Sequence, residues 1–218
     1  MGQAIVITSG KGGVGKTTTS ANIGTALALL GKKVCLVDTD IGLRNLDVVM
    51  GLENRIIYDL IDVAEGRCRL NQALVKDKRF DELYMLPAAQ TKDKNAISPD
   101  QVKDIILELK KEFEFVIIDC PAGIEQGFKN AIAGADQAIV VTTPEHAAVR
   151  DADRIIGLLE NSHISSPKLV VNRIKINMMK SGDMLDIEGI LQVLNIDLIG
   201  IVPDDEKVIK AANRGEPT

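Results

Sequence analysis

The residues with the clearest chemistry lie near the N-terminus, in the segment SGKGGVGKTT at positions 9–18. This segment follows the apolar run of residues 4–7 and precedes a helix-like pattern, the order that is typical of a nucleoside triphosphate site. Glycines let successive backbone N–H groups turn toward phosphates, where a Cβ would obstruct them. The sequence therefore predicts a phosphate-binding loop, whose residues are Gly10, Lys11, Gly12, Gly13, Val14, Gly15, Lys16, Thr17 and Thr18.

The two lysines of this loop are expected to have different tasks. Lys16 should reach the β- and γ-phosphates, and Thr17 should hold Mg²⁺. Lys11 follows the first glycine, where it is poorly placed to reach the same nucleotide. We therefore expect Lys11 to contact the nucleotide of a facing subunit, as an arginine finger does. A solvated surface lysine is the alternative.

Aspartates close two of the apolar runs that we expect to be buried strands. Asp38 and Asp40 follow one run, and Asp119 ends another. Mg²⁺ prefers hard oxygen ligands, and ligands bind parallel sheets at the carboxyl ends of the strands. We predict that Asp119 holds Mg²⁺ through water and that Asp40 orients or deprotonates the attacking water. Asp38 is expected to assist near the metal or near Lys16, and helix capping is the alternative for each aspartate.

Two late segments are candidates for recognition of the base. Asn172 and Arg173 follow one predicted strand, and Pro203 and Asp205 follow another. An amide can pair with both the donor and the acceptor edges of adenine, while a proline and an arginine plane can flank the ring. The guanine-reading sequence NKxD is absent, so we predict ATP as the ligand. Ordinary loop residues are the alternative.

Short apolar runs alternate with helix-like patterns, which predicts an α/β fold with a mostly parallel sheet and helices on both faces. No internal repeat or linker interrupts this alternation, so we expect one domain over residues 1–218. The predicted strands cover residues 4–8, 33–38, 83–86, 115–119, 137–142, 168–171 and 198–202.

Composition excludes several classes of protein. A net charge of −5 and an aromatic content of 3% argue against a nucleic-acid-binding surface. The three cysteines lack CxxC spacing, so neither a disulfide framework nor a zinc site is expected. The lone Cys120 after Asp119 offers too few ligands for an iron–sulfur cluster. Without a signal peptide or a run of about 18 apolar residues, the chain is expected to be cytoplasmic.

Residues 145–154 combine an apolar helical face with dense mixed charge that includes Asp151 and Asp153. A solvated helix with ion pairs between its turns is one interpretation. A dimer or partner surface is the other.

The loop GKGGVGKT resembles the deviant Walker A motif of the MinD/ParA ATPases, which dimerise around two ATP molecules. Further strings are similar to the septum-placing branch of that family, and the resemblance covers essentially the whole chain. These strings are DIGLRNLD at 40–47, LNQAL at 70–74, LPAAQT at 86–91, VRDADR at 149–154, GDML at 182–185 and NRGEP at 213–217.

The resemblance implies an ATP-hydrolysing switch that forms an ATP-dependent homodimer with Mg²⁺ as cofactor. It also implies attachment to the cytoplasmic face of the cell membrane, recruitment of a MinC-like inhibitor of septation, and in some members a MinE-like activator. It assigns Lys11 to the other subunit's nucleotide, and Asp151 and Asp153 to the partner surface. Family members usually continue with another helix and a basic amphipathic tail, so we expect this chain to be a truncated form of a membrane-binding parent.

Three other functions stay open at this point. A ParA-type partition ATPase would act on DNA, which the net charge of −5 disfavours mildly. A scaffold protein would bind the nucleotide with negligible turnover. A redox ATPase would carry a metal cluster.

Overall fold

The computed structural model describes residues 1–93 and 95–218. These residues form one sheet of eight strands in the order β3-β4-β2-β5-β1-β6-β7-β8. Every pair of neighbouring strands is parallel except the short antiparallel pair β3 and β4. The strands are β1 (Gln3–Thr8), β2 (Val34–Asp38), β3 (Val75–Lys76), β4 (Leu83–Leu86), β5 (Phe115–Asp119), β6 (Gln137–Thr142), β7 (Lys168–Ile174) and β8 (Asp197–Pro203).

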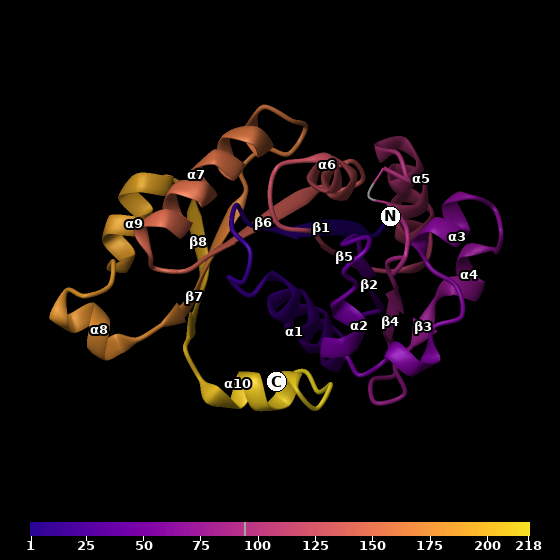
Figure 1. Cartoon of the computed structure of the whole chain (residues 1–218), viewed down its shortest axis with the longest axis horizontal. Coiled ribbons are helices and arrows are strands. Elements are labelled where there is room, and N and C mark those ends of the chain that lie inside the picture. Colours follow the sequence, from indigo (N-terminus) through magenta and orange to yellow (C-terminus); the bar gives the residue numbers. More distant parts are fainter. Residues whose placement is uncertain (94) are drawn as a thin grey trace.

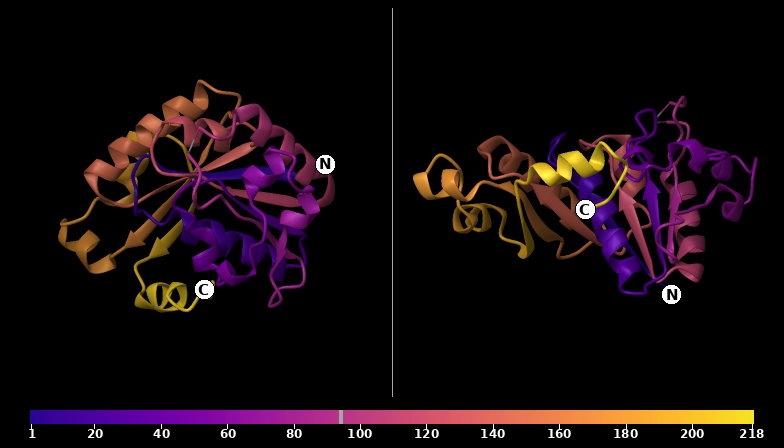
Figure 2. Two further views of the ribbon diagram at one scale, coloured as in Figure 1. Left: turned by 45° about the vertical axis from the view of Figure 1, so that its right-hand side comes forward. Right: turned by 90° about the horizontal axis from the view of Figure 1, so that it is seen from below.

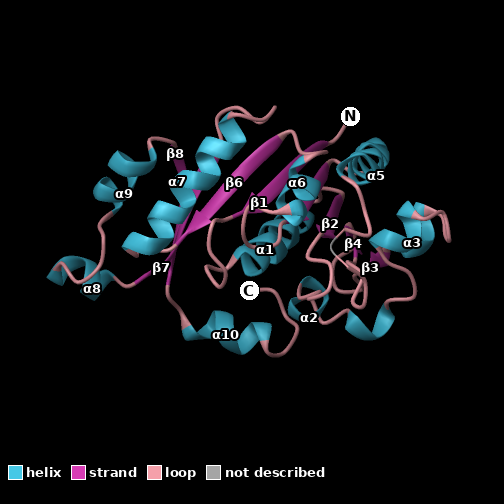
Figure 3. Ribbon diagram, turned by 45° about the horizontal axis from the view of Figure 1, so that its top comes forward, coloured by secondary structure: helices cyan, strands magenta, loops and turns pink. Residues whose placement is uncertain are grey.

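Helices cover both faces of the sheet, as the alternating pattern predicted. In Figure 1, α5, α6 and α7 lie above the sheet, whereas α1 and α10 lie below it. Figure 3 shows the same layers with helices and strands in separate colours. The helices are α1 (Lys16–Leu29), α2 (Leu46–Val49), α3 (Leu60–Ala64), α4 (Leu70–Ala73), α5 (Pro99–Glu112), α6 (Gln126–Ile132), α7 (His146–Glu160), α8 (Ile176–Ser181), α9 (Ile187–Leu194) and α10 (Glu206–Ala212), with a 3₁₀ turn at Glu53–Arg55.

The apolar face of the long helix α5 is buried. In α5, Val102, Ile106 and Leu109 pack into the core between the helices and the sheet. Ser98 caps the start of this helix by accepting from the N–H of Gln101. The helix-like pattern expected between the apolar runs is thus confirmed for α5.

The sequence prediction differs from the structure at both ends of the sheet. The strand β3 has only two residues, which is too short for an alternating pattern to reveal it. At the other end, β7 extends to Ile174 and is irregular against β8, with register shifts between Leu169 and Val170 and between Val171 and Ile174. Asn172 and Arg173 therefore lie within this irregular part of β7 and not in a loop after it, and Pro203 is the last residue of β8.

The central strands bring the predicted aspartates to one edge of the sheet. Ile7 of β1 is in register with Asp119 of β5, and Asp119 is in register with Asp38 of β2. The phosphate-binding loop begins directly after the end of β1, so the loop and both carboxylates lie at the same edge of the sheet.

The segment after α10 turns back toward α1, as the view from below in Figure 2 shows. Arg79 connects this segment with the end of α2, because its guanidinium donates to the carbonyl of Gly215 at 2.7 Å and also to the carbonyl of Met50. The backbone N–H of Thr218 donates to Oδ1 of Asn22 in α1 at 2.6 Å. Among the described residues, no helix combines the length and apolarity needed to cross a membrane.

A valine at Gly24 tests how tightly α1 packs on the sheet. A Cβ at Gly24 would lie 2.3 Å from Cδ2 of Leu36, which is fully buried in β2. We expect Gly24→Val to lower the free energy of unfolding by about 1–3 kcal/mol, the usual cost of overpacking a core. Urea unfolding measures this value.

The control is Gly157→Val in α7, where nothing lies within 4 Å of the added Cβ. This variant should be as stable as the unmodified protein or slightly more stable. Equal effects of the two substitutions would contradict the packing described for α1.

Candidate active site

The loop between β1 and α1 has the backbone conformation that phosphate binding requires. Gly13 and Gly15 have φ values of 77° and 100°, in the left-handed region that glycine adopts without strain. Gly15 precedes α1 and provides no side-chain cap. The first N–H groups of α1 are therefore directed to a site where the helix dipole favours an anion.

Lys16 is buried at the bottom of this loop. Its Nζ donates to Oγ of Ser9 at 3.0 Å, and that hydroxyl donates to the carbonyl of Lys11 at 2.7 Å. Ser9 thus connects the side chain of Lys16 with the backbone of Lys11. We did not predict Ser9 as a site residue, because a single serine after a strand carries no spacing pattern.

Lys11 has a different environment from Lys16. Its side chain is 42% exposed and forms an ion pair with Glu145, just before α7, with 3.2 Å between Nζ and Oε2. Exposed pairs of this kind contribute about 0–1 kcal/mol, so the bond to Glu145 is easily exchanged for another. Lys11 is therefore a surface cation that a second molecule can reach.

Asp119 lies at the centre of the site and is almost completely buried. Burial raises the pKa of its carboxyl to about 6, while hydrogen bonds from Thr17 and Ser20 and the charge of Lys16 lower it. Ser20 donates to Oδ1 at 2.9 Å. The protein thus surrounds this carboxylate with donors from α1 without fully offsetting the cost of its burial.

Asp38 faces Asp119 from the neighbouring strand. Burial and the charge of Asp119 raise the pKa of Asp38 well above its usual value. Its two oxygens accept from the backbone N–H groups of Asp40, at 2.8 Å, and of Leu46, at 3.2 Å. The bond to Leu46 holds the first residue of α2, which is the kind of bond that the helix-capping alternative predicted.

Asp40 lies close to the same pair, since its charge raises the pKa of both Asp38 and Asp119. Asp38, through its bond to the N–H of Asp40, fixes the backbone from which the Asp40 carboxylate projects. The three predicted aspartates therefore gather at one place, next to the phosphate-binding loop.

The residues present fit a bound Mg²⁺. Asp119 and Asp38 are buried carboxylates whose mutual repulsion a divalent cation would relieve, and the hydroxyl of Thr17 hydrogen-bonds to Asp119. Mg²⁺ is commonly held by one or two protein oxygens together with phosphate oxygens and water. Thr17 and Asp119 are the residues of this chain that would hold it.

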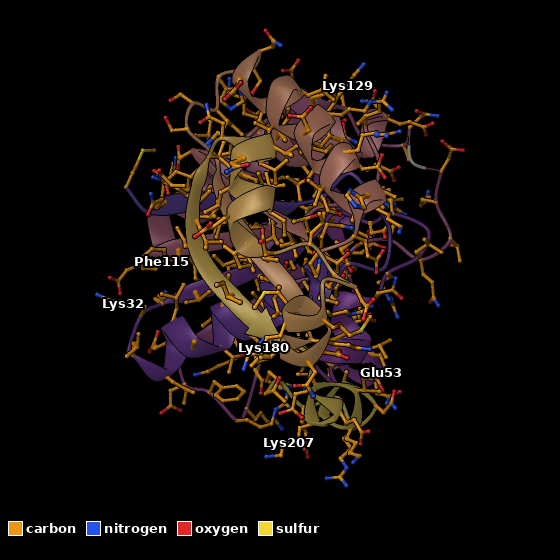
Figure 4. All side chains as sticks on the ribbon, turned by 90° about the vertical axis from the view of Figure 1, so that its left-hand side faces the viewer. Lys32, Glu53, Phe115, Lys129, Lys180 and Lys207 are labelled. Atoms are coloured by element: carbon orange, nitrogen blue, oxygen red, sulfur yellow. The ribbon has the colours of Figure 1, made fainter. Side chains whose placement is uncertain are left out.

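The predicted base-recognition residues line one large cavity. Its volume is about 1310 Å³, and its walls include Asn172, Arg173, Pro203 and Asp205 together with Gly15 of the phosphate-binding loop. Figure 4 views the molecule from the side of β8, one of the strands that border this cavity. The structure therefore brings these four residues together and connects them with the loop.

Asn172 also braces the phosphate-binding loop. Its Nδ2 donates to the carbonyl of Val14 at 2.8 Å, and its Oδ1 accepts from the N–H of Arg173 at 2.9 Å. Arg173 has a φ of 59°, an uncommon conformation for a residue other than glycine and one that often marks a functional site. Asp205 caps α10 by accepting from the N–H of Lys207 at 2.8 Å, so its carboxylate has a structural task as well.

Cys120 follows Asp119 but points into the protein interior. Burial raises the pKa of its thiol to about 12, and Thr8 donates to its Sγ at 3.6 Å. A buried, protonated thiol packs as a small apolar side chain and does not resemble a cluster ligand. The geometry thus gives no support to the redox alternative.

Helix α7 touches the phosphate-binding loop directly. A Cβ on Gly10 would lie 2.2 Å from the carbonyl oxygen of Asp151, so only a glycine permits this approach. Asp151 is half-buried, and Asp153 is exposed on the outer face of the helix. The two predicted partner residues therefore sit on a helix that packs against the nucleotide loop.

Comparison with known proteins shows the family to which the chain belongs. Residues 5–218 match the profile of the CobQ/CobB/MinD/ParA nucleotide binding domain. The chain is 74% identical to the septum site-determining protein MinD of Bacillus subtilis, over 100% of this chain and 82% of that protein. The chain belongs to the MinD branch of this family.

Solved structures of the MinD family have the same fold. A chain of the MinC:MinD cell division protein complex of Aquifex aeolicus superimposes with a TM-score of 0.92 at 52% identity, covering 99% of this chain and 87% of that one. MinD of Pyrococcus horikoshii, complexed with Mg-ADP, gives a TM-score of 0.90 at 31% identity, covering 100% and 87%. The predicted family, the P-loop α/β fold and the ATPase class are confirmed.

An isosteric change at Asn172 tests whether the cavity and the loop act together. In Asn172→Asp, a carboxylate oxygen replaces the donor that faces the carbonyl of Val14 at 2.8 Å. Repulsion between these oxygens and the loss of a donor to the base should weaken ADP binding by about tenfold or more, the equivalent of about 1.4 kcal/mol. Fluorescence titration with a labelled ADP measures the affinity.

Asn161→Asp is the matched control. Asn161 makes the same kind of bond, from Nδ2 to the carbonyl of Gly157 at 2.7 Å, on an exposed turn at the end of α7. Its substitution should leave ADP affinity unchanged. Equal losses of ADP affinity in both variants would show that the effect does not come from the proposed base site.

Proposed function

We propose that this MinD-family chain is an ATP-driven dimerisation switch that takes part in placing the division septum. The observation that carries this proposal is the division of labour between its two loop lysines. Lys16 is buried beside Asp119, whereas Lys11 is exposed and, in the described part of the chain, forms its ion pair with the surface carboxylate of Glu145. This arrangement supports one lysine acting on the nucleotide in its own subunit and the other acting across a dimer.

Within one subunit, the loop N–H groups and Lys16 would bind the phosphates, and Thr18 would add a further contact at the start of α1. Thr17 and Asp119 would hold Mg²⁺, which supplies positive charge to the phosphate oxygens when bound. Asp40 would orient the attacking water and accept its proton. Asp38 would keep Asp40 in place through the hydrogen bond to its N–H.

Between subunits, Lys11 would leave Glu145 and reach the nucleotide of the partner. The exchange is inexpensive, because the side chains of Lys11 and Glu145 are 42% and 61% exposed. After hydrolysis and loss of phosphate, the partner nucleotide offers Lys11 less negative charge. Dissociation of the dimer would follow.

A MinC-like inhibitor is the partner that we propose for the outer face of α7. The Aquifex aeolicus complex named above contains both MinC and MinD, and Asp153 is exposed on this helix. Since Gly10 touches the backbone of Asp151, a change in the loop can reach this face directly. We also propose that residues 1–218 act as one domain and that the protein works at the cytoplasmic face of the cell membrane.

Solution mass in the presence of ATP and Mg²⁺, compared with ADP, tests the switch. In an Asp40→Ala background, which should bind ATP without hydrolysing it, we expect a dimer with ATP and a monomer with ADP. Adding Lys11→Ala should abolish the dimer while ATP still binds. Lys16→Ala should lower the affinity for ATP by at least about 100-fold, because the variant loses a charge-assisted contact of about 3 kcal/mol.

Two outcomes would overturn the proposal. Normal ATP-dependent dimers of the Lys11→Ala variant would exclude action of Lys11 across the interface. Binding of nonspecific DNA that depends on ATP and weakens steeply with salt would favour the partition ATPase. Linear phosphate release over many turnovers would dismiss the scaffold alternative.

A further inference from the structure

Ser20 is a buried hydroxyl in the active site that none of the roles above uses. It lies on α1, three residues after Thr17, so both hydroxyls project from the same face of the helix. Its side chain is fully buried. Ser20 Oγ donates to Oδ1 of Asp119 at 2.9 Å, across a separation of 99 residues in the chain.

The hydroxyl of Ser20 has a choice between two acceptors. Its Oγ also lies 3.0 Å from the carbonyl oxygen of Lys16, the usual partner of a serine within a helix. A hydroxyl carries one proton, so it serves one acceptor fully at a time. The carbonyl of Lys16 has the backbone N–H of Ser20 as its helical partner, whereas a buried carboxylate oxygen depends on side-chain donors.

Thr39 fixes the same aspartate from the opposite side. Its backbone N–H and its Oγ1 both donate to the carbonyl oxygen of Asp119, at 3.1 Å and 2.7 Å. Thr39 stands between Asp38 and Asp40, so this clamp connects the end of β2 with the end of β5. The backbone of Asp119 is therefore held by Thr39, and one oxygen of its carboxylate is held by Ser20.

We propose that Ser20 is a positioning residue for the Mg²⁺ site, which fixes Oδ1 of Asp119 so that the other carboxylate oxygen faces the ion's shell. The inference rests on the proposed function, because Asp119 acts on Mg²⁺ only if the chain binds a nucleotide with this ion. Ser20 touches neither nucleotide nor metal in this scheme. Groups that donate a hydrogen bond to a metal-binding side chain commonly raise the affinity for the metal about 10- to 100-fold.

The test compares Ser20→Val with Ser20→Thr, two side chains of the same size that differ in the hydroxyl. The readout is the Mg²⁺ concentration that gives half of the metal-dependent increase in affinity for N-methylanthraniloyl-ADP, with no turnover involved. Ser20→Val should raise this concentration about 10- to 100-fold. Ser20→Thr should keep it near the wild-type value, and the affinity measured in EDTA should be the same in both variants.

Thr25→Val is the matched control, since Thr25 is a buried hydroxyl residue of the same helix and contacts no site residue in the hydrogen bonds described. It should leave the Mg²⁺ dependence unchanged. Thermal unfolding of each variant without ligand identifies a general loss of structure. If Ser20→Val does not fold, Ser20→Ala replaces it against the same Ser20→Thr reference.

The possible results separate the inference from the proposed function. If the wild-type protein binds the labelled ADP equally well with and without Mg²⁺, the proposed metal-dependent function fails. If Mg²⁺ strengthens binding in the wild type and equally in Ser20→Val, the positioning role of Ser20 is wrong. A loss shared by Ser20→Val and Thr25→Val would also overturn it, because the effect would then belong to the helix as a whole.

Discussion

The active site depends on two carboxylates that are kept close together and away from water. Asp38 and Asp119 are register partners on adjacent strands and are almost fully buried. Bringing two such groups together is costly, since desolvation and mutual repulsion both oppose the charged forms. The structure meets part of this cost with donors from three directions: the backbone at Asp40 and Leu46, the hydroxyls of α1, and the nearby ammonium of Lys16. A bound divalent cation would offset the part of this cost that these donors do not compensate.

Sequence reasoning found the parts of this site that have a local pattern. The loop of residues 9–18 could be predicted because its glycines and lysines stand in a fixed order after a strand. Asp119 and Asp38 could be predicted because each ends an apolar run, and the topology of parallel strands brings such ends together. In both cases short-range spacing and a general rule of sheet construction were sufficient.

Other residues could not be found in this way, for physical reasons. Ser9, Ser20 and Thr39 matter through hydrogen bonds to groups that are distant in the sequence or through backbone atoms, and neither leaves a spacing pattern. The two-residue strand β3 is defined by its antiparallel pairing with β4, to which the chain returns after residues 77–82. The irregular part of β7 around Asn172 and Arg173 depends on packing against the phosphate-binding loop and on the register shifts with β8.

The outermost strand has a consequence for how the molecule behaves at high concentration. Within the described part of the chain, β8 pairs with β7 on one side and has no strand on the other. Its side chains include Ile199 and Ile201, which are 53% and 48% exposed. A strand with an open hydrogen-bonding edge and exposed apolar side chains is a template for pairing with a strand of another molecule. We expect any association of this protein through the β8 edge to be independent of ATP, to grow with protein concentration and to persist at high salt.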